Sequence, residues 1–149
     1  MSDLLYRREL LRLAADAHGA GRLADADATG LAHNPVCGDK VAIDLRLENG
    51  RVTDVRQETK ACVLTQASAA ILGKNLKGLA RPDVEALRDA LTAMLGANGP
   101  VPGTPFEDYA VFDAALGYPA RHVCVLLPVA AALAAFEASE AEKGKAIRS

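Results

Sequence analysis

The sequence predicts an α+β fold in which a small antiparallel sheet packs against helices. Residues 41–48 alternate apolar and polar side chains, and an Asn-Gly dipeptide and a second segment with two valines follow up to residue 57, which is typical of a half-buried β-hairpin. The segments before and after this stretch repeat apolar residues at helical spacing. A chain of 149 residues can bury a sizeable core, so we expect a single domain over residues 1–149.

The N-terminal part predicts one helix followed by an extended stretch. Residues 3–18 place their leucines on one helical side and stop before Gly19, so they predict an amphipathic helix. Residues 23–35 are expected to be extended or irregular, because Pro35 lacks a backbone donor and disfavours a helical conformation at Asn34.

The alternating segment predicts a hairpin that turns at Asn49-Gly50, the preferred dipeptide of a two-residue hairpin turn. Its first strand has four apolar side chains on one face, and the second strand returns with Val52 and Val55 among polar residues. We expect the four to face the helices: Val41, Ile43, Leu45 and Leu47.

The C-terminal half predicts three helices and one short helical turn. Residues 62–78 are rich in helix formers, and residues 81–96 carry one apolar stripe behind a proline suited to a first turn. Residues 106–119 suggest a short helix or turn. The last helix opens near Ala120, and we expect a frayed polar tail at residues 143–149. The stripe consists of Val84, Leu87, Leu91, Met94 and Leu95.

The charge and hydropathy of the chain exclude several classes of partner. A formal net charge of −2 and an isoelectric point near 5.9 disfavour binding to nucleic acid or to an anionic membrane, which both require a basic face. No uninterrupted apolar run has the length of a membrane span, and the N-terminus lacks the apolar core of a signal peptide. We therefore expect a cytoplasmic protein.

The three cysteines lie at the ends of predicted elements rather than within an apolar stripe. Cys62 and Cys124 fall near predicted helix N-termini, where free amides favour thiolate, and Lys60 and Arg121 act in the same direction. Thiolates suit soft metals and sulfur chemistry, whereas Asp39 near Cys37 offers a harder oxygen ligand or a proton acceptor. On residue types alone, three small buried thiols are an equal alternative.

Three motifs occur in a specific order: NPVCGD at 34–39, ACVLTQASAAILG at 61–73 and YPARHVC at 118–124. Together with an opening helix at 5–23, they resemble the U-type iron–sulfur cluster scaffold family, which comprises IscU, SufU and the N-terminal domain of NifU. The resemblance implies a SufE/NifU-like fold with three antiparallel strands backed by helices. It also implies four residues that bind zinc or a transient iron–sulfur cluster: Cys37, Asp39, Cys62 and Cys124.

The same resemblance implies the function. As a scaffold, the protein would receive sulfur from a pyridoxal-phosphate cysteine desulfurase and build a transient 2Fe–2S cluster for apo-proteins. As an alternative, it would hold Zn(II) at these residues and act as a sulfurtransferase that takes a persulfide and activates the desulfurase. Cys124 is the expected persulfide acceptor. Arg121 resembles the arginine of the SufU branch and would stabilise the Cys124 thiolate.

Several positions depart from the family pattern. Thr59 and Ala61 replace glycines beside the second cysteine, which predicts a less mobile loop. Val123 stands where the IscU branch has histidine, and His122 is rotated by about 100° on a helix, so we expect a surface or hydrogen-bonded histidine. The proline-rich stretch that docks a dedicated Hsp70 chaperone is absent, so that chaperone is not an expected partner.

Two alternative interpretations assign the chain to other classes of protein. In the first, the chain is a cysteine-dependent enzyme with Cys62 or Cys124 as nucleophile and His122 as base. In the second, it is an adaptor that has lost its site. No glycine motif typical of an oxyanion hole accompanies either cysteine, so we do not expect a classical enzyme.

Overall fold

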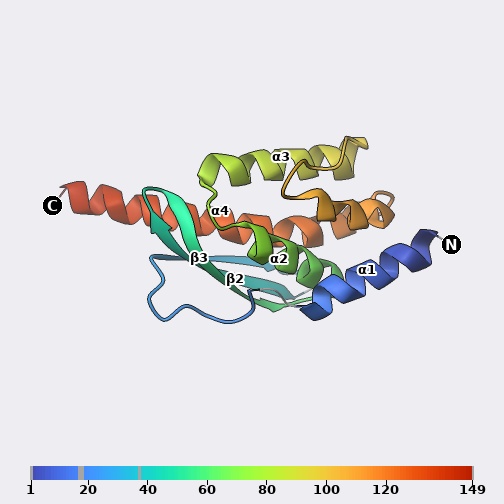
Figure 1. Cartoon of the computed structure of the whole chain (residues 1–149), viewed down its shortest axis with the longest axis horizontal. Coiled ribbons are helices and arrows are strands. Elements are labelled where there is room, and N and C mark those ends of the chain that lie inside the picture. Colours follow the sequence, from blue (N-terminus) through green and yellow to red (C-terminus); the bar gives the residue numbers. More distant parts are fainter. Residues whose placement is uncertain (1, 17–18, 37, 149) are drawn as a thin grey trace.

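The protein was analysed as a computed structural model that describes residues 2–16, 19–36 and 38–148, with side chains described except at 2–7, 114 and 142–148. Three strands form one antiparallel sheet in the order β1-β2-β3, and helices cover it (Figure 1). The predicted α+β class is therefore confirmed. The elements are α1 (Ser2–Asp16), β1 (Ala28–Asn34), β2 (Asp39–Glu48), β3 (Arg51–Lys60), α2 (Val63–Asn75), α3 (Arg81–Ala97), the 3-10 helix η1 (Glu107–Ala115) and α4 (Pro119–Arg148).

The predicted hairpin is formed by β2 and β3. Asn49 and Gly50 both have positive φ angles, 54° and 79°, as the favoured two-residue turn requires. The pairing extends beyond the predicted 41–57 to residues 39–60, with one bulge where Arg46 and Leu47 meet the partner strand. Val41, Ile43 and Leu45 are buried as expected, whereas Leu47, just past the bulge, is only half-buried.

The opposite face of the sheet is covered locally, around Ala42 and Asp44, which alternation alone does not predict. Residues 19–21 pair with the outer edge of β3 at Gln57, and the chain then continues to the start of β1. Arg22 in this segment forms an ion pair with Asp44 of β2 at 2.7 Å, and Thr29 donates a hydrogen bond to the same carboxylate at 2.6 Å. The Arg22 hydrogen bond is the main cause that lowers the pKa of Asp44 to about 2.

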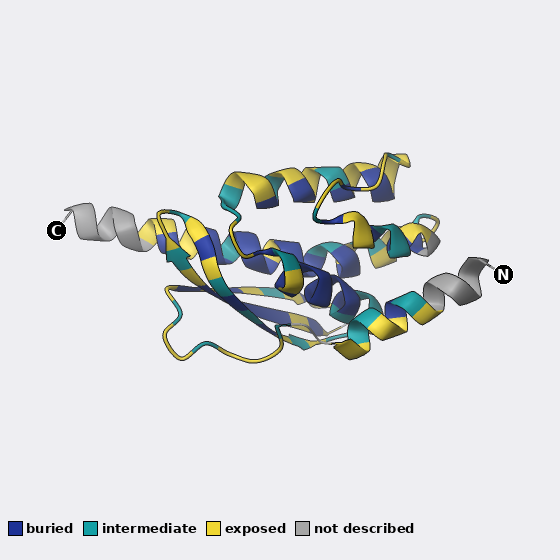
Figure 2. Ribbon diagram, viewed as in Figure 1, coloured by how far each residue is buried: buried dark blue, intermediate teal, exposed yellow. Residues whose placement is uncertain are grey.

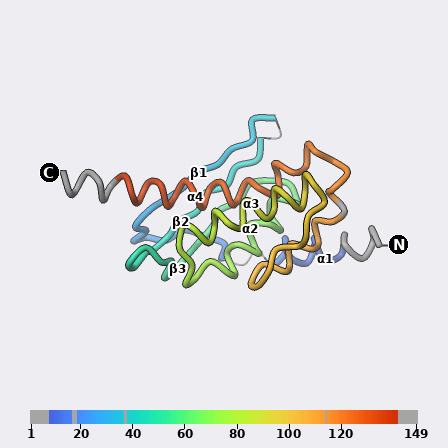
Figure 3. Tube along the Cα trace, turned by 90° about the horizontal axis from the view of Figure 1, so that it is seen from above, coloured from blue at the N-terminus to red at the C-terminus, as the bar shows by residue number. Residues whose placement is uncertain are grey.

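The segment expected to be extended or irregular, residues 23–35, ends in strand β1. Gly30 of this strand touches α4 so closely that a Cβ there would lie 1.9 Å from the carbonyl oxygen of Ala131. Ala131, Ala132 and Ala135 are fully buried in the contact. The alanine-rich composition of α4 thus lets the helix lie directly on β1, and the two run side by side in Figure 3.

The helical predictions hold within a few residues at each end. The apolar stripe of α3 is buried at all five predicted positions, and Asp83 accepts a hydrogen bond from the backbone of Ala80 at 2.9 Å to cap this helix. The backbone of α4 stays helical through residues 143–148, so fraying of this end remains a prediction. Buried positions gather between α2, α4 and the sheet, while the outer side of α3 is exposed (Figure 2).

Helix α4 contains a long apolar stretch. By length and composition alone, Pro119–Ala141 is long and apolar enough to cross a membrane, but 61% of its apolar window is buried inside the fold. Its contacts with β1, α2 and α3 account for this hydrophobicity. In the described part of the chain, α4 is thus the central helix of the hydrophobic core.

Candidate metal centre

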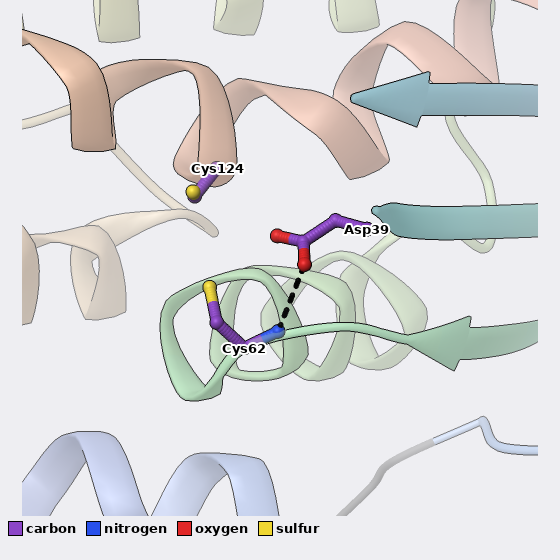
Figure 4. Close-up of side chains that lie close together, drawn as sticks. All are labelled: Asp39, Cys62 and Cys124. Atoms are coloured by element: carbon purple, nitrogen blue, oxygen red, sulfur yellow. Dashed lines mark hydrogen bonds between the residues drawn. The ribbon is translucent and has the colours of Figure 1, made fainter. Parts of the chain in front are cut away.

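Three elements place one side chain each in a common cluster. Asp39 is the first residue of β2, Cys62 precedes α2, and Cys124 lies in the second turn of α4. A carboxylate oxygen of Asp39 and the two sulfur atoms all lie within 4.8 Å of one another (Figure 4). Asp39 and Cys124 are buried but Cys62 is exposed, so the cluster is accessible from the Cys62 side.

Cys37, the fourth residue expected at this site, lies outside the described residues. Its neighbours Val36 and Gly38 are exposed and belong to the turn between β1 and β2. Asn34 and Asp39 pair across that turn. Cys37 therefore stays a predicted ligand, and the described cluster contains three of the four predicted residues.

Asp39 is held by the start of α2. Its Oδ1 accepts a hydrogen bond from the backbone nitrogen of Cys62 at 3.3 Å, and its Oδ2 accepts one from the Thr65 hydroxyl at 3.0 Å. Cys62 occupies the position before the helix and makes no capping hydrogen bond through its own side chain. The Asp39 carboxylate therefore binds the backbone nitrogen of the N-cap residue, as the N3 side chain does in a capping box.

Thr65 is a site residue that sequence reasoning missed. Its side chain is fully buried, and its oxygen lies 3.4 Å from the sulfur of Cys62 as well as 3.0 Å from Asp39. A signal was present in the sequence: the third residue after a helix-capping position lies over that position, as in a capping box. Spacing from Cys62 could have marked Thr65 as a neighbour of that cysteine, whereas its contact with Asp39 could not be predicted from the spacing.

Cys124 differs from the expectation for a cysteine near a helix N-terminus. It lies past the first turn of α4 and is only 4% exposed. Burial, followed by the nearby Cys62, raises the pKa of its thiol to about 12. Burial thus has a larger effect on the pKa of Cys124 than the helix dipole, and without a bound cation Cys124 is a neutral thiol.

Arg121 and His122 make other contacts near the start of α4. The guanidinium of Arg121 lies 5.3 Å from the ring centroid of the exposed Tyr118. A role for Arg121 in stabilising the thiolate therefore stays a prediction. The Nε2 of His122 lies 3.1 Å from the carbonyl oxygen of Ala115 and 3.3 Å from that of Leu116, which confirms the expected hydrogen-bonded histidine.

A buried polar network fixes α2 against α4 below the cluster. The hydroxyl of Ser68 donates to the carbonyl oxygen of Val125 at 2.6 Å and lies 3.1 Å from the hydroxyl of Tyr109. Tyr109 donates in turn to the carbonyl oxygen of Ser68 at 3.2 Å. Because Val125 follows Cys124 directly, this network fixes the position of the Cys124 backbone relative to the helix that follows Cys62.

The donor set suits a thiophilic metal. Two sulfur atoms and one carboxylate oxygen are ligands that zinc and iron accept, and Cys37 would complete a set of three sulfurs and one oxygen. Zn–S bonds of about 2.3 Å in a tetrahedron separate neighbouring sulfur ligands by roughly 3.8 Å. The three ligand atoms lie within 4.8 Å of one another, so they would have to move only slightly closer together to bind one ion.

Comparison with known proteins identifies one family over most of the chain. Residues 5–125 match the family described as NifU-like N terminal domain. The iron–sulfur cluster assembly scaffold protein IscU of Thermotoga maritima is 27% identical over 129 residues, covering 83% of this chain and 87% of the relative. The zinc-dependent sulfurtransferase SufU of Bacillus subtilis is 29% identical over 76 residues, covering 51% of each chain.

The scaffold protein IscU 1 of Archaeoglobus fulgidus is 31% identical over 77 residues, which cover 51% of this chain and 50% of that protein. The chain thus spans about half the length of the first curated relatives that it matches. Among solved structures, a NifU-like protein (N-terminal) from Brucella abortus superposes with a TM-score of 0.88 at 35% identity. The superposition covers 95% of this chain and 99% of that one, so the fold is shared nearly throughout.

Proposed function

Because this chain belongs to the family of NifU-like N-terminal domains, with IscU and SufU proteins among its relatives, we propose that it is an iron–sulfur cluster assembly scaffold. The observation that carries the proposal is the convergence of Asp39, Cys62 and Cys124 from three separate elements to within 4.8 Å. A transient 2Fe–2S cluster is the cargo, held by these residues and Cys37 and then passed to apo-proteins.

Sulfur enters from a pyridoxal-phosphate cysteine desulfurase that carries it as a persulfide. The acceptor cysteine first loses its proton to solvent, which a bound cation or opening of the site would favour, and its thiolate then attacks the outer sulfur. A new S–S bond forms while the donor's S–S bond breaks and the donor leaves as thiolate. An electron donor then reduces this sulfur to sulfide for the cluster. By the family resemblance the acceptor is Cys124, and because Cys124 is buried, transfer requires the site to open beside the exposed Cys62.

A zinc-dependent sulfurtransferase is the second candidate function. The spacing favours it, because three ligand atoms within 4.8 Å of one another suit a single ion. Zinc would be held by Cys37, Asp39, Cys62 and Cys124, and it would keep thiols deprotonated at neutral pH. The chain's own part would be to release one cysteine on the open side for the desulfurase persulfide.

The proposed function also implies the partners of the protein and the compartment in which it acts. Its partners are a cysteine desulfurase and apo-proteins that accept clusters, in the cytoplasm, where thiols stay reduced. Neither nucleic acid nor a membrane is a partner, and no dedicated Hsp70 chaperone is required. The protein is one domain over residues 1–149 and acts as a scaffold or a sulfur carrier rather than as a classical enzyme.

Metal and sulfide analysis of protein purified without oxygen tests both candidates. Iron with equimolar labile sulfide, bound after incubation with desulfurase, cysteine and ferrous iron, supports the scaffold. One zinc without sulfide, together with faster alanine production by the desulfurase, supports the sulfurtransferase.

Matched variants locate the site in the same experiment. Cys62→Ala and Cys124→Ala should lose the bound metal, whereas His33→Ala, which removes an exposed histidine of β1 outside the cluster, should keep it. Binding of neither iron nor zinc by the parent protein would contradict the proposed function.

A further inference from the structure

Thr65 lies between two of the candidate ligands, with its oxygen 3.0 Å from Oδ2 of Asp39 and 3.4 Å from the sulfur of Cys62. The Thr65 residue is fully buried. No buried side-chain oxygen or nitrogen in the described residues lacks a hydrogen-bond partner, so this hydroxyl contributes to a fully bonded cluster.

The directions of these bonds follow from the single proton of the hydroxyl. A carboxylate only accepts, so the Thr65 hydroxyl donates to Asp39. Its oxygen then faces the sulfur of Cys62 as an acceptor. One small side chain therefore contacts both an oxygen ligand and a sulfur ligand, and it sets their separation.

The oxygen that Thr65 contacts is the one directed into the cluster. Oδ1 of Asp39 is turned to the backbone nitrogen of Cys62, while the other oxygen points toward the two sulfur atoms (Figure 4). A carboxylate oxygen has two lone pairs, so a hydrogen bond to one leaves the other free for a metal. The bond from Thr65 thereby fixes the direction of the free lone pair.

We propose that Thr65 is a positioning residue that holds Asp39 and Cys62 at the spacing and orientation required for metal binding. This inference rests on the proposed function, because it assumes that the cluster binds metal. Groups that orient metal ligands through hydrogen bonds typically change metal affinity when they are removed. Thr65 acts through Asp39 and Cys62 and does not itself bind the metal.

The experiment compares Thr65→Val, which replaces the hydroxyl by a methyl group of similar size, with Thr65→Ser, which keeps the hydroxyl. Zinc affinity is measured by competition with a chromophoric chelator, and cobalt(II) reports ligand geometry through its absorption bands. Thr65→Val should weaken zinc binding by about 10- to 100-fold and change the cobalt bands, whereas Thr65→Ser should stay close to the parent.

Thr92→Val is the matched control, since Thr92 is an exposed residue of α3 that bonds only within its own helix, to Arg88. It should leave affinity and spectrum unchanged. Melting of the metal-free proteins separates a general loss of stability from a change at the site. If Thr65→Val does not fold, Thr65→Ala removes the hydroxyl without adding a methyl group, and the same affinity loss is expected.

A Thr65→Val protein with the parent's affinity and cobalt spectrum overturns the inference, whatever its melting temperature. Failure of Thr65→Ser to restore binding overturns it as well. If the parent protein binds neither zinc nor cobalt, the inference fails at its premise, and the proposed function fails as well when the parent also binds no iron. The parent measurement therefore distinguishes failure of the site from failure of the role assigned to Thr65.

Discussion

Asp44 combines a nearly inaccessible carboxylate with a half-exposed cationic partner, Arg22. The ion pair and the hydrogen bond from Thr29 lower the pKa of Asp44 from 3.8 to about 2. Because the folded state holds the proton more weakly than the unfolded chain does, the ionised form stabilises the fold. This contribution is complete above pH 3.8 and is lost as the pH falls through 2.

Asp44→Asn should therefore reduce the loss of unfolding free energy that occurs as the pH is lowered. Between pH 5 and pH 2 the parent should lose about 2 kcal/mol of unfolding free energy that the variant does not lose. Urea unfolding at several pH values measures this difference. Asp89→Asn, an exposed carboxylate of α3 beside Arg88, is the control and should follow the parent. Parallel pH profiles for Asp44→Asn and the parent would refute the role given to the ion pair.

At the scale of elements, the contact between β1 and α4 is set by one glycine. A Cβ at Gly30 would meet the backbone of α4 at Ala131 and Ala135, and a backbone cannot rotate away as a side chain can. The helix would have to move off the strand, and with it Cys124 would move relative to Asp39. The packing of α4 on the sheet therefore also determines the geometry of the cluster.

Gly30→Ala should destabilise the protein by about 1–3 kcal/mol or more, as overpacking of a close contact does. Gly96→Ala is a control for which the expected change in stability has the opposite sign, because a Cβ at Gly96 in α3 meets no atom within 4 Å. It should stabilise the protein by up to about 1 kcal/mol through helix propensity. Chemical denaturation of both variants and the parent measures the two changes in unfolding free energy. Equal effects of the two substitutions would contradict the described contact.

At the scale of the whole molecule, a metal at the cluster connects three elements. Ligands on β2, α2 and α4 come together only in the folded chain, so an ion that binds them stabilises the fold by mass action. Zinc at a free concentration of 100 times its dissociation constant should add about 2.7 kcal/mol and raise the melting temperature, and a chelator should reverse the shift. Cys62→Ala should show no such shift. An unchanged melting temperature of the parent in saturating zinc would count against the site.

Local sequence patterns predicted the elements whose stability depends on their own residues. The β2–β3 hairpin follows from alternation and Asn49-Gly50, and α3 from its apolar stripe. For strand β1 the sequence predicts only an extended or irregular segment. Gly30 has no side chain that could indicate a buried face, and the reason for a glycine at this position is the contact with α4. The coverage of Asp44 was missed because its partner Arg22 lies far away in the sequence.

The site was predictable only through the order of its motifs. No spacing rule places Asp39, Cys62 and Cys124 together, because their meeting depends on how the sheet, α2 and α4 pack. The raised pKa of Cys124 depends on burial, which its place near the start of a helix did not reveal. Thr65 was missed because its role exists only beside Asp39, which belongs to another element.

The pairing of residues 19–21 with β3 has a consequence for self-association. Gly21 donates to the carbonyl oxygen of Gln57, and Gln57 donates to that of Gly19, so both backbone groups of Gln57 on the outer edge of β3 are bonded within the same chain. An open strand edge can recruit a strand from a neighbouring molecule and lead to aggregation. The segment that follows α1 thus blocks this edge at Gln57 against pairing with a strand of another molecule.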